Sequence, residues 1–242
     1  MSIQANNNVV ETQVVGEVEY RLIVEQDDMP MCPWEDFDML GTLVTWHSRR
    51  SIGHEQPKVS ADEWLLILAG IDEDGYHEWW GARTPKSGVS FQDALNRKID
   101  RELDAKGIVL LPVYAYEHGG ITISTGSFSC SWDSGQLGYI YTTREKIVES
   151  YGRGKGARLR QNDKKNARKV LEAEIETVDQ YLTGDVWCWR IESRAVPVLQ
   201  SQTSENETGW QLIESCYGCY GHGYTVDEGK ATLTRAIEID AN

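Results

Sequence analysis

Apolar residues recur at helical spacing in the middle of the chain. Phe91, Leu95, Ile99 and Leu103 follow one another at four-residue steps, which is one face of an α-helix, and Gly107 is a typical end. Shorter helices are expected where capping-box patterns precede apolar runs: one opened by Ser60 and running through Gly70, one opened by Thr142 and running to Tyr151, and one opened by Thr225 and running to about Ile237.

The longest predicted helix covers residues 158–182 and ends at Thr183-Gly184. A single apolar stripe at helical spacing indicates that one side of this helix is buried. The stripe consists of Ala167, Leu171, Ile175, Val178 and Leu182.

Alternating and β-rich segments predict strands between these helices. A hairpin is expected from 108–116 to 121–124, and further strands at 14–24, 137–142 and 185–193. Strands follow strands, and helices separate the groups, which favours an α+β fold with a mostly antiparallel sheet. Residues 1–13 lack periodicity, so we expect a loose tail followed by one domain over 14–242. No glycine-rich motif follows a strand and opens a helix, which argues against a Rossmann or P-loop site.

The composition is that of a globular chain. Of 242 residues, 26% are charged and 40% hydrophobic, enough apolar material for a core. No apolar run is long enough to span a membrane, and the N-terminus lacks the features of a secretory signal. Five cysteines form an odd set, which favours free thiols in a reducing cytoplasm over a disulfide framework.

Acidic residues are concentrated near the N-terminus. The chain has a formal net charge of −14, and residues 1–40 hold nine carboxylates against Arg21 alone. Six of them surround the 30–34 loop, where Trp34 could anchor a partner within a charged rim. The alternative is that these carboxylates only solvate a flexible segment. The six are Glu25, Asp27, Asp28, Glu35, Asp36 and Asp38.

Basic residues are concentrated in a single strip over 153–169, where eight cations face Asp163 alone. Such a strip could contact nucleic acid, although the acidic remainder of the chain would repel phosphate. The alternative is an ordinary solvated helix face. The strip consists of Arg153, Lys155, Arg158, Arg160, Lys164, Lys165, Arg168 and Lys169.

A Cys-x-x-Cys motif near the C-terminus is a candidate metal site. Cys216 and Cys219 could hold one zinc ion, with His222 as a third ligand. A structural zinc site needs a fourth ligand, and the sequence has no second Cys-x-x-Cys or histidine pair. We therefore expect no metal and no cofactor, and interpret the motif as a strand and turn in a reduced protein.

A second chemical candidate combines a thiol, an imidazole and a carboxylate. Cys130 could act as nucleophile, with His118 as base and Asp133 orienting the imidazole. The spacing does not establish that these groups meet. The alternative is a polar loop that shapes a hairpin.

Four segments together resemble an uncharacterised group of proteins from bacteriophages and related mobile elements. The most specific is Trp132-Asp133-Ser134-Gly135-Gln136, and the likeness covers roughly residues 34–190. The resemblance implies a phage setting and the cytoplasm of a bacterial host, and it assigns no catalytic residue. The segments are Phe37–Thr42, Tyr116–Thr122, Cys130–Gly138 and Asp179–Val186.

Setting and charge together suggest a phage-encoded acidic protein that inhibits a host defence protein. A nucleic-acid-handling effector, such as a CRISPR or restriction nuclease, would offer a positive channel for the acidic surface. One alternative is a zinc- or cysteine-dependent hydrolase or transferase. The other is a nucleic-acid-binding accessory protein that uses the basic strip.

Overall fold

The computed structural model describes residues 8–81, 90–154, 156–196 and 209–240. The chain divides into two compact units, one made of residues 1–32 and 180–242 and the other of residues 33–179. We call them the terminal unit and the central unit. Linear periodicity suggested one domain over 14–242. It does not reveal this division, because the terminal unit is assembled from both ends of the chain.

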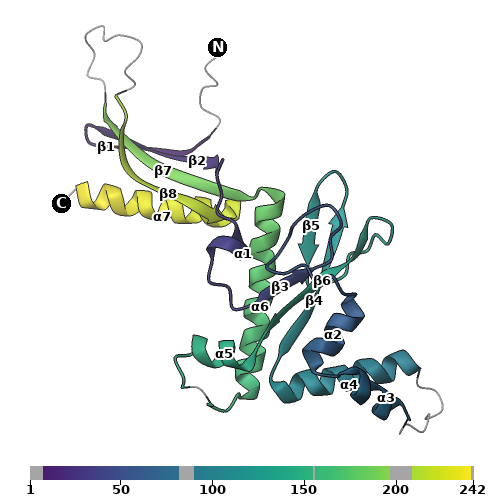
Figure 1. Ribbon diagram of the computed structural model, residues 1–242. Helices are drawn as coiled ribbons and strands as arrows, with labels where there is room; N and C mark the ends of the chain where they lie inside the picture. Colours follow the sequence, from purple (N-terminus) through teal and green to yellow (C-terminus); the bar gives the residue numbers. More distant parts are fainter. Residues whose placement is uncertain (1–7, 82–89, 155, 197–208, 241–242) are drawn as a thin grey trace. The chain divides into compact units, whose positions relative to one another are not determined.

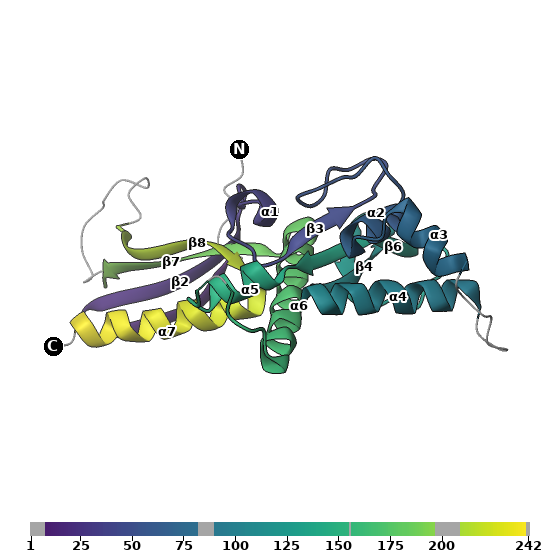
Figure 2. The ribbon, with the colours of Figure 1, turned by 60° about the horizontal axis from the view of Figure 1, so that its bottom comes forward.

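The terminal unit is a four-stranded antiparallel sheet with one helix. Its strand order is β1-β2-β7-β8, so β1 and β8 form the edges (Figure 1). Helix α7 lies along one face of this sheet (Figure 2). The elements are β1 (Val9–Val15), β2 (Val18–Gln26), β7 (Val186–Ala195), β8 (Gln211–Tyr220) and α7 (His222–Asp240).

The two faces of this sheet have different chemistry because successive strand residues point to opposite sides. One face packs a core under α7 that includes Leu22, Trp189 and Leu233. The other face carries ion pairs between β2 and β7, among them Arg21–Glu192 at 2.6 Å. Further cross-strand pairs on this face are Arg194–Glu19 and Arg190–Glu25.

The predicted N-terminal tail and first strand require correction. Val9–Val15 forms β1, which pairs with β2 through a hairpin whose turn contains Gly16 at a φ of 61°. The sequence showed one alternating run over 14–24 because the alternation continues on both sides of the turn. Residues 1–7 of the predicted tail lie outside the described residues.

The central unit contains the second antiparallel sheet, in the order β3-β6-β4-β5. Its strands are β3 (Thr42–Thr45), β4 (Val109–Glu117), β5 (Ile121–Ser124) and β6 (Ser134–Thr142). Its helices are α1 (Pro33–Asp36), α2 (Ala61–Ala69), α3 (Glu73–Gly81), α4 (Phe91–Lys106) and α5 (Arg144–Ser150), followed by α6 (Gln161–Thr183), whose last residues belong to the terminal unit.

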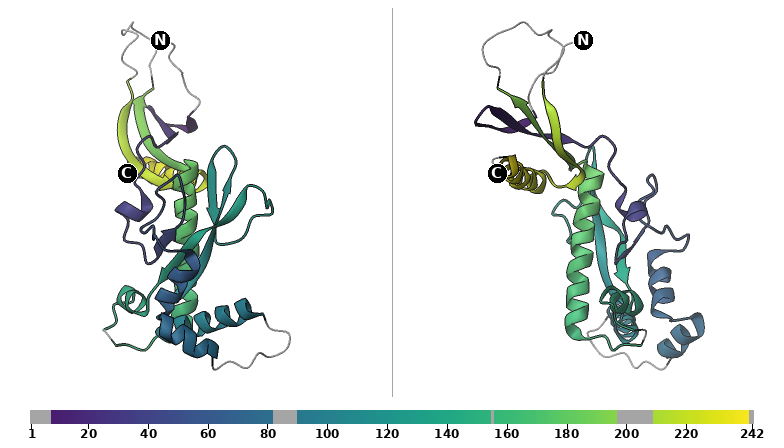
Figure 3. Two further views of the ribbon diagram at one scale, coloured as in Figure 1. Left: turned by 45° about the vertical axis from the view of Figure 1, so that its right-hand side comes forward. Right: turned by 90° about the vertical axis from the view of Figure 1, so that its left-hand side faces the viewer.

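Helices cover both faces of the central sheet (Figure 3). On one face, Trp64 of α2 stacks on Tyr139 of β6 with ring centroids 5.7 Å apart. On the other face, the side chain of Ile140 from β6 and that of Leu171 from α6 both lie beside Gly41. Successive side chains of β6 point to opposite faces of the sheet, so Tyr139 contacts α2 and Ile140 lies on the side of α6.

The predicted α+β class is confirmed, including its longest helix. Helix α6 begins three residues later than predicted, and Leu171, Ile175 and Val178 of its stripe are buried. Helix α5 is capped by Thr143, which accepts from the Lys146 N–H, and not by Thr142 as the capping-box pattern suggested. Within the described residues, no helix has both the length and the apolar character needed to cross a membrane.

Candidate functional site

A β-bulge in β8 brings the two cysteines of the Cys-x-x-Cys motif to the same face of the sheet. Trp187 pairs with Cys219 and Trp189 with Cys216, so two residues of β8 oppose one residue of β7. In a regular strand, residues three apart point to opposite faces. The extra residue shifts that alternation by one position, and both thiols lie on the side of α7.

Gly218 provides the backbone conformation of this bulge. Its φ is 69°, in the left-handed region that glycine adopts without steric cost. Its N–H donates to the Asp27 carboxylate at 2.9 Å, and the same carboxylate also accepts from the Met29 N–H. Asp27 thus connects the bulge to the chain that follows β2.

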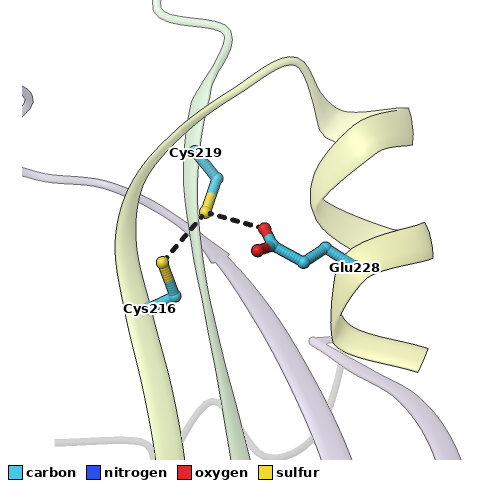
Figure 4. Close-up of side chains that lie close together, drawn as sticks. All are labelled: Cys216, Cys219 and Glu228. Carbon is cyan, nitrogen blue, oxygen red and sulfur yellow. Dashed lines mark hydrogen bonds between the residues drawn. The ribbon is translucent and has the colours of Figure 1, made fainter. Parts of the chain in front are cut away.

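Glu228 of α7 completes a cluster with the two thiols (Figure 4). The Sγ atoms of Cys216 and Cys219 lie 3.7 Å apart, and the Cys219 Sγ is 3.9 Å from the Glu228 carboxylate. The three ligand atoms all lie within 4.8 Å of one another. Cys219 is buried, while Cys216 and Glu228 are half-buried, so the cluster lies at the margin of the core.

The contacts of Glu228 come from a tryptophan, a tyrosine and the thiols. The Trp189 Nε1–H donates to its carboxylate at 3.5 Å, and the carboxylate raises the pKa of the neighbouring Tyr224 phenol. Among the described residues, no lysine or arginine forms an ion pair with Glu228. Burial, followed by the Cys216 thiol and the Glu228 carboxylate, raises the pKa of Cys219 to about 12.

His222, the third ligand suggested by sequence, is not in the cluster. Its ring packs against Trp187 with centroids 4.5 Å apart, and its backbone N–H donates to Asp185. Glu228 was not predicted as a ligand, because the capping-box pattern at Thr225 places the start of the last helix three residues too late. The helix begins at His222, so Glu228 lies in its second turn and faces the sheet.

The structure does bring Cys130, His118 and Asp133 together, in an order that differs from the proposed triad. Asp133 lies in the middle: its carboxylate is 3.8 Å from the Cys130 Sγ and 3.6 Å from the His118 Nδ1. No hydrogen bond joins the imidazole to the thiol within the described residues. A base that activates a nucleophile must contact it, so these three residues lack the decisive contact.

The six carboxylates of the acidic segment, residues 25–38, are divided between the two units. The first three, Glu25, Asp27 and Asp28, belong to the terminal unit and line a surface cavity of about 510 Å³. Glu25 pairs with Arg190, whose guanidinium lowers the pKa of that carboxyl. Asp27 holds the bulge, while Asp28 is exposed. The cavity is lined by Glu25, Gln26, Asp27, Asp28, Met29, Met31, Cys188, Arg190, Tyr217 and Gly218.

The second half of the acidic segment belongs to the central unit. Trp34 lies in the short helix α1 and is half-buried. Glu35, Asp36 and Asp38 are exposed. Phe37 is 36% exposed, but the apolar groups at the cavity of the terminal unit are exposed more fully, at 88% for Met29 and 68% for Tyr217.

Part of the basic strip is committed to structural ion pairs. Arg153 pairs with Asp163 at 2.7 Å, and Lys164 pairs with Asp104 at 2.6 Å. Lys155 lies outside the described residues. The strip residues that are exposed are Arg158, Arg160, Lys165, Arg168 and Lys169.

No family model, no curated protein and no solved structure matches this chain. The resemblance to bacteriophage proteins stays a prediction.

Proposed function

We propose that this chain is a phage-encoded acidic protein that binds a cationic, nucleic-acid-handling defence protein in the host cytoplasm and inhibits it stoichiometrically. The observation that carries the proposal is the cavity of the terminal unit, where carboxylates and exposed apolar side chains occur together. Asp27 and Asp28 line it beside Met29, Met31 and Tyr217. Methionine and tyrosine are enriched at protein interfaces, and methionine adapts readily to a partner's shape.

The distribution of charge supports the same proposal. The terminal unit has 15 Asp and Glu against 5 Lys and Arg, a net charge of −10 out of −14 for the whole chain. An acidic surface of this kind attracts a positively charged partner and accelerates association. A channel built to hold nucleic acid is such a partner, because it must neutralise phosphates.

The cavity also suggests how a partner would be held. A lysine or arginine side chain could place its apolar stem against Met29 and Tyr217 while its charge meets Asp28. Trp34 was the anchor expected from sequence, but Met29 and Tyr217 are more exposed and lie at the cavity itself. We therefore assign the anchoring role to these two residues and the steering role to the exposed carboxylates.

The test removes exposed charges and leaves the bulge intact. The first variant combines Asp28→Asn, Glu35→Gln, Asp36→Asn and Asp38→Asn; Asp27 is left unchanged because its carboxylate holds Gly218. A matched control removes four exposed carboxylates elsewhere, by Glu145→Gln, Glu149→Gln, Glu172→Gln and Glu176→Gln. Affinity capture from a bacterial lysate identifies the partner, and binding kinetics are then measured over a range of salt concentrations.

We expect the first variant to associate about tenfold or more slowly at low salt, with a flatter salt dependence, while the control behaves as the parent. Tyr217→Ala should mainly speed dissociation. Duplex DNA should displace the chain from its partner, and inhibition should need about one chain per target. Equal association rates for both four-site variants would refute the role of this segment, and inhibition far below equimolar amounts would indicate an enzyme.

A second candidate function is nucleic-acid binding through the basic strip. It is favoured by five exposed cations within 158–169, next to the start of α6. The combined variant Lys165→Gln, Arg168→Gln and Lys169→Gln should then weaken binding of a labelled oligonucleotide and reduce its salt dependence. Unchanged anisotropy titrations would exclude this candidate.

A further inference from the structure

We propose that Cys216, Cys219 and Glu228 bind a thiophilic divalent cation of the zinc class, with the fourth coordination position open to solvent. The proposal is independent of the proposed function, since it concerns the α7 side of the sheet and not the cavity. It revises the expectation from sequence that this motif holds no metal.

Two of the three separations within the cluster are close to those of tetrahedral zinc coordination, and the third lies within 4.8 Å. Zinc–sulfur bonds of about 2.3 Å at the tetrahedral angle place two sulfurs about 3.8 Å apart. The two Sγ atoms are separated by 3.7 Å. With a zinc–oxygen bond of about 2.1 Å, sulfur and oxygen should lie about 3.6 Å apart. The observed distance from the Cys219 Sγ to the Glu228 carboxylate is 3.9 Å.

The donor set also fits such an ion. Two thiolates select a soft or borderline cation, whereas Mg²⁺ and Ca²⁺ prefer oxygen ligands alone. Three groups that can each carry a negative charge converge within 4.8 Å, and in the described residues no basic side chain pairs with Glu228. A divalent cation would balance this convergence of charge.

Glu228 has the outer partners that a ligating carboxylate needs. The Trp189 indole N–H donates to it, and Tyr224 lies beside it on α7. Such partners orient a ligand and tune its affinity for the metal. His222 is not in the cluster, so the Cys-x-x-Cys motif by itself provides only two ligands. The fold provides the third, Glu228, from helix α7. Three protein ligands leave one position for water, as in zinc sites that are open to exchange.

A bound cation would connect the edge strand to the helix that covers the sheet. Cys216 and Cys219 lie in β8, and Glu228 lies in α7. The metal would thus stabilise the bulge from the α7 side, while Asp27 holds it from the other. Removal of the metal should therefore lower the thermal stability of the full chain.

The experiment measures zinc content and cobalt spectra of the full chain. Protein purified without chelator or added metal is analysed by mass spectrometry for zinc, and the apoprotein is titrated with Co²⁺. The ligand variants are Cys216→Ser and Glu228→Gln, both at half-buried positions. The controls are His222→Ala, which removes the imidazole next in sequence, and Cys188→Ser, which removes a thiol outside the cluster. Circular dichroism confirms that each variant folds.

We expect about one zinc per chain in the parent and in both controls. Cobalt should produce the thiolate charge-transfer band and the visible bands of tetrahedral coordination. Cys216→Ser should abolish that charge-transfer band or weaken it strongly. Glu228→Gln should reduce affinity by at least the 10–100-fold typical for loss of an outer partner.

Three results would overturn the proposal. The first is absence of zinc together with no thiolate–cobalt band in folded protein. The second is loss of metal in His222→Ala with full retention in Glu228→Gln. The third is a Cys216–Cys219 disulfide in metal-free protein purified without reductant, which would identify the pair as a redox dithiol.

Discussion

The glycine in the β8 bulge offers a sharp test of how this chain positions its thiols. Gly218 has a φ of 69°, and nothing lies within 4 Å of the place where a Cβ would be added. The cost of a side chain here is therefore conformational and not steric. A left-handed conformation costs an ordinary L-residue roughly 1–2 kcal/mol, and a β-branched residue adopts it least readily.

We expect Gly218→Val to lower the free energy of unfolding by about 1–2 kcal/mol, or to straighten the bulge. Straightening would move one of the two thiols to the opposite face and separate sulfurs that now lie 3.7 Å apart. Gly218→Asn is the matched control, because asparagine tolerates the left-handed region. It should retain both the stability and the thiol geometry.

The assay combines urea unfolding with labelling by a trivalent arsenical, which bridges two thiols only when both reach one arsenic atom. The parent and Gly218→Asn should bind the reagent tightly through Cys216 and Cys219. Gly218→Val should either bind it more weakly or unfold at lower urea. Unfolding within about 0.5 kcal/mol of the parent and unchanged arsenical binding would show that the bulge does not depend on glycine.

Three further predictions concern the central unit. Leu171→Ala should cost about 2–5 kcal/mol in urea unfolding, because Leu171 is fully buried; a loss below about 0.5 kcal/mol would contradict its core position. Gly138→Ala should cost about 3 kcal/mol or more, because its Cβ would lie 2.0 Å from the backbone oxygen of Val44, whereas Gly135→Ala in the same strand meets open space and should be nearly neutral. Burial raises the pKa of the Glu174 carboxyl above its ordinary value of 4.5, so the folded state holds this proton more tightly than the unfolded state, and the free energy of unfolding should fall as pH rises above 4.5. Glu174→Gln should flatten that decline, and equal slopes of stability against pH for the two proteins would refute the role of Glu174.

Elements set by local periodicity were predictable from the sequence. The stripe of α6 and the four-residue repeat of α4 each bury one side of a helix, and Ser90 caps α4 where its pattern begins. These features depend on residues within a few turns of one another, so the side chains themselves carry the information. Helix α3 was not predicted, because Glu73–Gly81 is short and buries no residue; its few apolar side chains, among them Tyr76 and Trp79, are only partly buried against the core beside α4.

The candidate site depended on relations that only the tertiary structure decides. A single extra residue in β8 moves the side chains that follow it to the opposite face of the sheet. The alternation of apolar and polar residues in the sequence does not show where such an extra residue lies. Glu228 joins Cys216 and Cys219 because α7 packs on the sheet in one particular rotation. The terminal unit likewise pairs β2 with β7 across more than 150 intervening residues. Such contacts are fixed by packing between distant segments, and local sequence contains no signal for them.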